Sequence, residues 1–256
     1  MSKIFIVTSG PTNERIDDVM KITNMSTGKL GAMVVDRLLE NAPEGEIAKI
    51  YYVCSKMAAR PSVESGLVRE VVVESTNDML NTLRCLLKSS EHIDAVVHAA
   101  AVGDYKTTYT ARAESIANEL IQKQCEKSEA LSYDEIMEVL CEPRCIVGND
   151  DTKISSYEDH LMVMLGLTPK VISSIKKFSP DTKLIGFKLL DNVSKGELFS
   201  VADTLRKKNA ADYIVANDLN KIGNGRHGAM IVGKDGIVAE CETKLDIAET
   251  IAGLIL

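Results

Sequence analysis

The segment 21–31, Lys-Ile-Thr-Asn-Met-Ser-Thr-Gly-Lys-Leu-Gly, contains residues whose types and spacing could hold an anion. Ser26 or Thr27 is suited to cap the apolar helical pattern that follows. Gly28 would let a ligand approach the backbone, and Lys29 adds a positive charge within the first turn. Because a helix start presents unpaired N–H groups and a positive dipole end, the segment predicts a phosphate or carboxylate site. An ordinary capped strand–helix connection explains the same residues equally well.

This segment matches neither of the two common phosphate-binding motifs. A P-loop requires Ser or Thr after its lysine, and Leu30 follows Lys29 here. A dinucleotide-binding turn requires three spaced glycines, and the connection after the first strand-like run contains only Gly10. A nucleotide bound here would therefore need a different backbone arrangement.

Small residues follow a second apolar run, Ile-Asp-Ala-Val-Val-His-Ala-Ala. Ala100, Ala101 and Val102 would allow a ligand to lie against the backbone at the carboxyl end of a strand. Asp104 comes next, and the alternative is a tight turn closed by this aspartate. His98 lies inside the apolar run. We interpret it as a hydrogen-bonded core histidine rather than a base, because buried polar side chains usually have partners.

Apolar runs and helical patterns alternate along the chain, as in a parallel sheet with helices on both faces. We therefore predict an α/β fold with a Rossmann-like, mostly parallel sheet whose ligands bind at the carboxyl ends of the strands. The predicted strands are 4–8, 47–54, 67–73, 93–100, 161–167, 183–189 and 211–218, with a C-terminal hairpin at 229–240. The predicted helices are 30–39, 79–87, 110–125, 133–140, 194–208 and 244–256, with a further helix start at Thr168.

Length and composition restrict the possible classes of protein. One domain, 1–256, fits 256 residues, with 106–152 as an insertion that serves as a lid or a dimer contact, and two small domains are the alternative. The net charge of −7 argues against nucleic acid as the main partner, and no run is apolar and long enough to span a membrane. The six cysteines lack metal-site spacing and are expected as free thiols in a reducing cytoplasm. No metal ligands are predicted.

Four separated segments together resemble phosphopantothenoylcysteine synthetases, ligases that join 4′-phosphopantothenate to cysteine in coenzyme A biosynthesis. Pro11, Thr27 and Leu30 replace the Gly, Ser and Met that are usual in the family. The decarboxylase segment that precedes many bacterial members is not in this sequence, so we expect a stand-alone synthetase. The resemblance rests on the first segment at 8–31, Ala-Ala-Ala-Val-Gly-Asp-Tyr at 99–105, Ile-Gly-Phe at 185–187 and Ala-Asp-Tyr-Ile-Val-Ala-Asn-Asp at 211–218.

The resemblance implies a two-step reaction, in which a nucleoside triphosphate activates phosphopantothenate and cysteine then captures the acyl-nucleotide. It implies CTP as the cosubstrate, with ATP as the alternative, together with Mg²⁺ and a homodimer. Ser155 and Ser156 stand where bacterial members carry further lysines beyond Lys153. The implied catalytic residues are Asn24 and Lys153, and Asn24 and Asn217 are implied to bind substrate. The implied nucleotide-binding residues are Gly10, Ser26, Gly28, Lys29, Ala100, Ala101, Val102, Asp104, Phe187, Lys207 and Lys208.

A short-chain dehydrogenase-like, NAD(P)-binding oxidoreductase is the alternative enzyme class. Tyr52 and Lys56 have its Tyr-x-x-x-Lys spacing, and 99–101 is similar to its Asn-Ala-Gly segment. Their order along the chain is reversed, the glycine-rich turn is missing, and no acidic residue ends the second predicted strand to hold a ribose. A nucleotide-binding module without catalysis is a third interpretation, and turnover that requires phosphopantothenate would separate it from a ligase.

Overall fold

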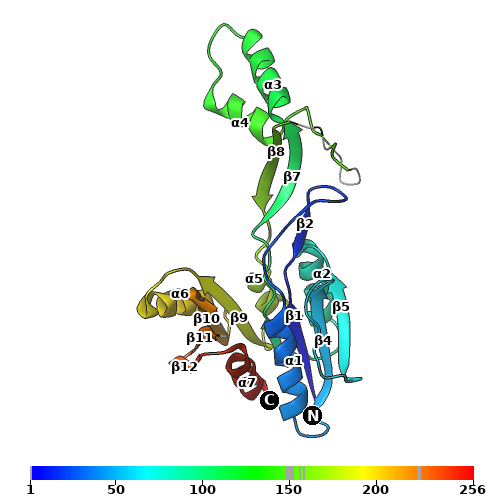
Figure 1. Cartoon of the computed structure of the whole chain (residues 1–256), viewed down its shortest axis with the longest axis vertical. Helices are drawn as coiled ribbons and strands as arrows, with labels where there is room; N and C mark the ends of the chain where they lie inside the picture. Colours follow the sequence, from blue (N-terminus) through cyan, green and yellow to red (C-terminus); the bar gives the residue numbers. More distant parts are fainter. Residues whose placement is uncertain (1, 148–152, 156, 158, 224–225) are drawn as a thin grey trace. The chain divides into compact units, whose positions relative to one another are not determined.

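The computed structural model describes residues 2–147, 153–155, 157, 159–223 and 226–256, and the chain forms two compact units (Figure 1). The first unit consists of Met1–Thr12, Asn24–Val102 and Lys170–Leu256. The second consists of Asn13–Thr23 and Gly103–Pro169. Each unit is thus built from segments that lie far apart in the sequence.

An eight-stranded sheet forms the centre of the first unit, in the order β12-β11-β10-β9-β6-β1-β4-β5. The strands from β10 to β5 are parallel, and β11 and β12 add an antiparallel hairpin. This arrangement confirms the predicted Rossmann-like sheet. The strands are β1 (Lys3–Ser9), β4 (Ile47–Ser55), β5 (Val68–Val73), β6 (Ala95–His98), β9 (Lys183–Leu190), β10 (Tyr213–Gly223), β11 (Arg226–Gly233) and β12 (Gly236–Cys241).

Helices cover both faces of this sheet, because consecutive strand residues point to opposite sides. Val7 packs in the core with α1 and α7, whereas its neighbour Ile6 packs in the core with α2, α5 and α6. α1 and α7 lie side by side (Figure 1). The helices are α1 (Lys29–Asn41), α2 (Thr76–Leu87), α5 (Ile172–Phe178), α6 (Lys195–Lys208) and α7 (Lys244–Ile255).

The second unit contains two antiparallel strand pairs, β2 with β3 and β7 with β8, and two helices. Its small core is formed by Tyr109, Ala111, Ile116 and Val139. Ser132 caps α4 and forms a capping box with Glu135. The elements are β2 (Asn13–Arg15), β3 (Lys21–Thr23), β7 (Tyr105–Arg112), α3 (Ala113–Cys125), α4 (Tyr133–Cys141) and β8 (Leu161–Leu167).

Two local predictions in the second unit are wrong. Residues 110–112 extend β7 instead of opening a helix, because they pair with 161–163 of β8. The strand predicted at 161–167 is confirmed as β8 with the same bounds, and it lies in this small sheet. Thr168 caps no helix: its hydroxyl donates to Gly103 O, and α5 begins at Ile172.

Two other expectations concern the chain as a whole. Of the predicted insertion 106–152, residues 148–152 lie outside the described residues, and the single-domain assignment stays a prediction. In the described part of the chain, no helix combines the length and apolar character needed to cross a membrane.

Candidate active site

Two glycines shape the carboxyl end of β1. Gly10 and Gly28 have φ angles of 77° and 74°, in the left-handed region that side chains disfavour. A Cβ atom on Gly10 would lie 2.4 Å from Ala58 Cβ, and one on Gly28 would lie 2.9 Å from the same atom. Glycine is therefore required at both positions by backbone conformation and by space.

The start of α1 differs from the sequence prediction. Gly28, and not Ser26 or Thr27, is the N-cap residue, and no side chain caps the helix. Ser26 Oγ instead accepts a hydrogen bond from Gly28 N at 3.4 Å, and Ser9 Oγ donates to Gly28 O at 2.8 Å. Among the described residues, no side chain caps α1 and its first turn has no carboxylate, so the first-turn N–H groups and the exposed Lys29 are suited to an anionic ligand.

Ala101 joins the two motif-bearing segments of the first unit. Its N–H donates to Gly10 O at 2.9 Å. Its carbonyl accepts hydrogen bonds from Thr12 N at 3.2 Å and from Asn24 Nδ2 at 3.0 Å. The structure therefore brings Asn24, Gly10 and Ala101 together beyond the carboxyl ends of β1 and β6.

His98 supports this arrangement from the core. Its Nδ1 lies 2.9 Å from Thr8 Oγ1, and Thr8 Oγ1 accepts a hydrogen bond from Ala100 N at 3.1 Å. Burial lowers the pKa of His98 to about 4, so the ring is neutral near pH 7. The interpretation as a hydrogen-bonded core histidine is confirmed, and its Thr8 partner fixes the backbone that precedes Ala101.

Phe187 and Asn217 lie on the next strands of the sheet. His98 of β6 pairs with Gly186 of β9, which puts Phe187 beside the start of the Ala99–Val102 segment. Phe187 is half-buried and packs against the core under α1 and α7. Asn217 on β10 is 5% exposed, and its Nδ2 donates to Gly228 O at 3.0 Å. This hydrogen bond between β10 and β11 stabilises the sheet.

Lys207 and Lys208 are not brought to this cluster. They end α6, which runs from the carboxyl ends of the strands back to the amino ends, as the hydrogen bond from Asp212 N to Leu184 O near the start of β9 indicates. Lys207 Nζ pairs with Asp203 at 2.6 Å and is largely exposed. Within one copy of the chain, these lysines therefore lie at the amino ends of the strands, whereas Gly10 lies at the carboxyl end of β1.

Asp104 and Lys153 belong to the second unit, and both are exposed. The backbone next to Lys153 is held by Asp17, whose Oδ2 accepts a hydrogen bond from Ile154 N at 2.9 Å. Sequence reasoning missed Asp17. Its only sequence signal is its place in the first motif segment, whereas its contact with Ile154 spans 137 residues. The hydrogen bonds from Ile154, Met20 and Val19, with the charge of Lys153, lower the pKa of the Asp17 carboxyl.

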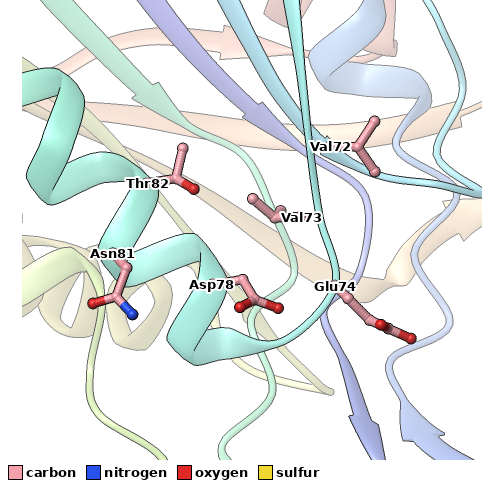
Figure 2. Close-up of a pocket in the computed structure, with 6 residues that line it drawn as sticks. All are labelled: Val72, Val73, Glu74, Asp78, Asn81 and Thr82. Atoms are coloured by element: carbon pink, nitrogen blue, oxygen red, sulfur yellow. The ribbon is translucent and has the colours of Figure 1, made fainter.

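A cavity of about 380 Å³ lies elsewhere, at the end of β5 and the first turns of α2 (Figure 2). The Asp78 carboxylate in its wall already accepts hydrogen bonds from Ser75 N and Ser75 Oγ, which close the capping box of α2. The cavity contains none of the predicted site residues. Its lining residues are Val72, Val73, Glu74, Asp78, Asn81 and Thr82.

The described residues bear on metal ligation and on the dehydrogenase alternative. Among them, no group of three or more His, Cys, Asp and Glu side chains is arranged to hold a metal ion. Tyr52 is fully buried, and its hydroxyl donates to Ala59 O at 2.5 Å. Tyr52 is therefore a structural residue and not the exposed acid that a dehydrogenase would need.

Comparison with known proteins identifies the family. Residues 1–140 match the family described as "DNA/pantothenate metabolism flavoprotein C-terminal domain". The chain belongs to this family. A crystal structure of the DNA/pantothenate metabolism flavoprotein from Streptococcus pneumoniae is 30% identical, with a TM-score of 0.77 over 100% of this chain and 98% of that one. This similarity agrees with the Rossmann-like sheet described above.

More distant relatives carry names from coenzyme A biosynthesis. The "Coenzyme A biosynthesis bifunctional protein CoaBC" of Thermococcus kodakarensis is 28% identical over 91% of this chain and 45% of the relative. A Cab2 mutant in complex with phosphopantothenate-cysteine shares the fold, with 14% identity, a TM-score of 0.63, and coverage of 99% of this chain and 85% of that one. The chain spans about half the length of the curated relatives it matches. Membership of this family does not favour the dehydrogenase alternative.

Proposed function

We propose that this flavoprotein C-terminal domain family member is a ligase that joins 4′-phosphopantothenate to L-cysteine. The observation that carries the proposal is the hydrogen bond from Asn24 Nδ2 to Ala101 O at 3.0 Å. It joins the two segments that most resemble the synthetases, next to an uncapped helix start that is suited to phosphate. The names of the CoaBC relatives support the same reaction.

The proposed chemistry has two steps. The phosphopantothenate carboxylate attacks the α-phosphate of a nucleoside triphosphate, and pyrophosphate leaves. The cysteine amine then attacks the acyl carbon, loses a proton and displaces the nucleoside monophosphate. Neither step needs a nucleophile from the protein, so the task of the site is alignment and charge neutralisation.

The residues of the first unit are assigned as follows. The N–H groups at the start of α1 bind phosphate oxygens, and Lys29 adds a positive charge. Asn24 lies beside Ala101 and orients the acyl-nucleotide for attack by cysteine. Gly10, Ser26 and Gly28 are assigned to the phosphate chain through the loop backbone that they shape, since Ala58 already fills the space that a side chain on either glycine would need.

The remaining assignments follow from the resemblance. Lys153 offsets charge at the α-phosphate, Asp104 contacts the nucleotide, and Mg²⁺ accompanies the triphosphate and screens its negative charge. Asn217 is assigned to phosphopantothenate. Lys207 and Lys208 could serve a nucleotide only across an interface with a second copy, which agrees with the proposed homodimer. The proposed location is the cytoplasm, where the six free cysteines would stay reduced.

Base recognition is assigned to the backbone beyond β6 and β9. Ala100 N, Ala101 N and Ala101 O already bond to Thr8, Gly10, Thr12 and Asn24. We therefore assign the base to Ala100 O, the Val102 backbone and the neighbouring Phe187. A donor and an acceptor from the backbone match the carbonyl and amino groups of cytosine, so CTP is proposed as the cosubstrate with ATP as the alternative.

The test is a reconstituted reaction. Purified protein with 4′-phosphopantothenate, cysteine, Mg²⁺ and either triphosphate should release one pyrophosphate for each 4′-phosphopantothenoylcysteine formed. Omission of phosphopantothenate should abolish the release, which separates a ligase from a simple nucleotide-binding module. Absence of pyrophosphate and product with both triphosphates would overturn the proposed function.

A further inference from the structure

Asp17 is a buried acidic residue whose two carboxylate oxygens have different partners. Oδ1 accepts hydrogen bonds from Val19 N at 2.7 Å and Met20 N at 2.6 Å, which close the turn between β2 and β3. Oδ2 accepts the hydrogen bond from Ile154 N at 2.9 Å. The side chain is 2% exposed. One oxygen therefore serves the local turn, and the other holds a segment that is remote in sequence.

The remote segment is the one that carries Lys153. Ile154 is 5% exposed, so its side chain is buried. Its backbone N–H is also hydrogen-bonded, to Asp17 Oδ2. Lys153, one residue earlier, is exposed. The chain is thus anchored at Ile154 while the adjacent lysine reaches solvent, and all of these residues belong to the second unit.

A local turn alone would not need this arrangement. An Asx turn uses a single side-chain oxygen, and Asp17 Oδ1 already supplies it. The second oxygen would cost free energy to bury without a partner, and a carboxylate bound to backbone N–H groups forms strong hydrogen bonds. The neighbouring Asp18 is half-exposed and instead lies 3.6 Å from Arg15.

We infer that Asp17 is a positioning residue, which holds the backbone at Ile154 and thereby sets where the Lys153 ammonium is presented during phosphate activation. The inference rests on the proposed ligase function, because it acts through the role assigned to Lys153. Asp17 itself touches no substrate in this assignment. Its contribution is to reduce the number of positions that the Lys153 side chain samples.

Asp17→Asn tests the inference because it changes one oxygen only. The amide oxygen can keep the two turn hydrogen bonds, while the NH₂ group would face Ile154 N, so two donors meet. Asp17→Ser is the second variant, since its hydroxyl can close the turn but cannot reach Ile154. Asp18→Asn is the matched control, because it removes the same charge from the adjacent residue without touching Ile154.

We expect Asp17→Asn and Asp17→Ser to lower kcat/KM for the triphosphate roughly 10- to 100-fold, as for other losses of alignment. Asp18→Asn should stay within about twofold of the wild type. A purely structural role would act equally in any background, so the decisive measurement adds Lys153→Gln. In that background, Asp17→Asn should lower kcat/KM by less than about threefold. An undiminished effect in the Lys153→Gln background, or wild-type activity of Asp17→Asn, would overturn the inference.

Hydrogen exchange gives a readout that is independent of turnover. The Ile154 amide should exchange at least about tenfold faster in Asp17→Asn than in Asp18→Asn, because its acceptor is lost. Unchanged exchange would overturn the inference even if activity fell. If the wild type itself fails to form product, the proposed function fails and the role of Lys153 with it. If the wild type is active but the two substitutions are additive, only the role of Asp17 fails.

Discussion

Asn24 donates a hydrogen bond that a small substitution can remove. Its Nδ2 donates to Ala101 O at 3.0 Å, and Asp at this position would have no N–H to donate and would set a negative charge against that carbonyl. We expect Asn24→Asp to slow the attack of cysteine on the acyl-nucleotide by roughly 10²- to 10³-fold. Rapid quenching and chromatography should then detect accumulated acyl-nucleotide.

Asn77→Asp provides the control for Asn24→Asp. Asn77 is exposed in the first turn of α2, where a new negative charge suits the helix dipole. This variant should turn over like the wild type. Wild-type turnover by Asn24→Asp would instead remove Asn24 from the proposed mechanism.

The burial of His98 should make the free energy of unfolding depend on pH. Its pKa is about 4 in the folded chain, against about 6.5 for an ordinary histidine, because burial disfavours the charged ring. Between these values the unfolded chain binds a proton that the folded chain does not. Stability is therefore complete above pH 6.5 and falls as the pH drops towards 4. We expect the contribution of His98 to fall by about 2 kcal/mol between pH 7 and pH 5.

The measurement is urea unfolding at pH 7 and pH 5. His98→Asn should lose stability at pH 7, because the smaller side chain leaves a gap in the core at a buried position, but should show a smaller decrease on acidification than the wild type. Equal pH dependence in the wild type and His98→Asn would contradict the neutral, buried state of His98.

Single residues were predictable from the sequence where their neighbours determine them. His98 lies in an apolar run, so its burial and its need for a partner could be inferred. Asp17 could not be identified, because its partner Ile154 lies 137 residues away. Lys207 and Lys208 matched a motif in the sequence, but their distance from Gly10 follows from the direction of α6 in the fold.

At the scale of elements, the close packing of α1 against the end of β1 makes a second stability prediction. Gly28→Ala combines a left-handed φ of 74° with a Cβ 2.9 Å from Ala58 Cβ. Gly45→Ala shares the unfavourable φ, 78°, but its Cβ would have no atom of the described residues within 4 Å. We expect a loss of about 1 kcal/mol at Gly45 from backbone strain, and at least about 2 kcal/mol at Gly28 because overpacking is added.

Chemical denaturation of the two glycine variants checks this expectation. The difference between their free energies of unfolding isolates the crowding by Ala58, Ser9 and Gly10 around a Cβ at position 28, since the backbone cost is common to both. Gly28→Ala should also weaken nucleotide binding, whereas Gly45→Ala should not. Equal losses would mean that the Ala58 loop moves aside without cost.

Elements were predictable where local pattern and packing agree. The strands at 47–54 and 67–73 and the helix after Ser75 lie where their apolar periods indicate. Residues 110–112 carry a helical pattern, but pairing with β8 holds them in a strand. The predicted cap at Ser26 or Thr27 failed because Gly28, held by Ser9 and crowded by Ala58, takes the cap position. Tertiary contacts decided both cases.

At the scale of the molecule, the site follows from strand order. β1 is flanked by β4 on one side and β6 on the other, so the connections that leave their carboxyl ends diverge. Ligands bind at such a point of divergence in open α/β sheets. Gly10 follows β1 and Ala101 follows β6, which places both there. The sequence gives the order of strands along the chain but not their order in the sheet, so this meeting could be expected only from the resemblance.

The proposed preference for CTP depends on the backbone at this same place. Ala100 and Ala101 are held by Thr8 and Gly10, and β6 and β9 are neighbours, so the backbone assigned to the base is fixed before the ligand binds. A fixed edge that matches cytosine should discriminate through transition-state binding. We expect kcat/KM for CTP to exceed that for ATP by at least about tenfold, equivalent to about 1.4 kcal/mol.

Pyrophosphate release, measured with each triphosphate over a range of concentrations, decides this preference. Thr8→Val is the informative variant, because it removes the hydroxyl that holds Ala100 N while keeping the shape of the side chain. Thr8→Val should reduce the preference for CTP, because the backbone assigned to the base becomes less fixed. It should reduce the rate of cysteine attack on the acyl-nucleotide less, because Asn24 keeps its hydrogen bond to Ala101. Equal or better turnover with ATP in the wild type would refute the CTP assignment and leave the ligase reaction intact. An unchanged CTP preference in Thr8→Val would instead mean that the base is read by side chains and not by this backbone.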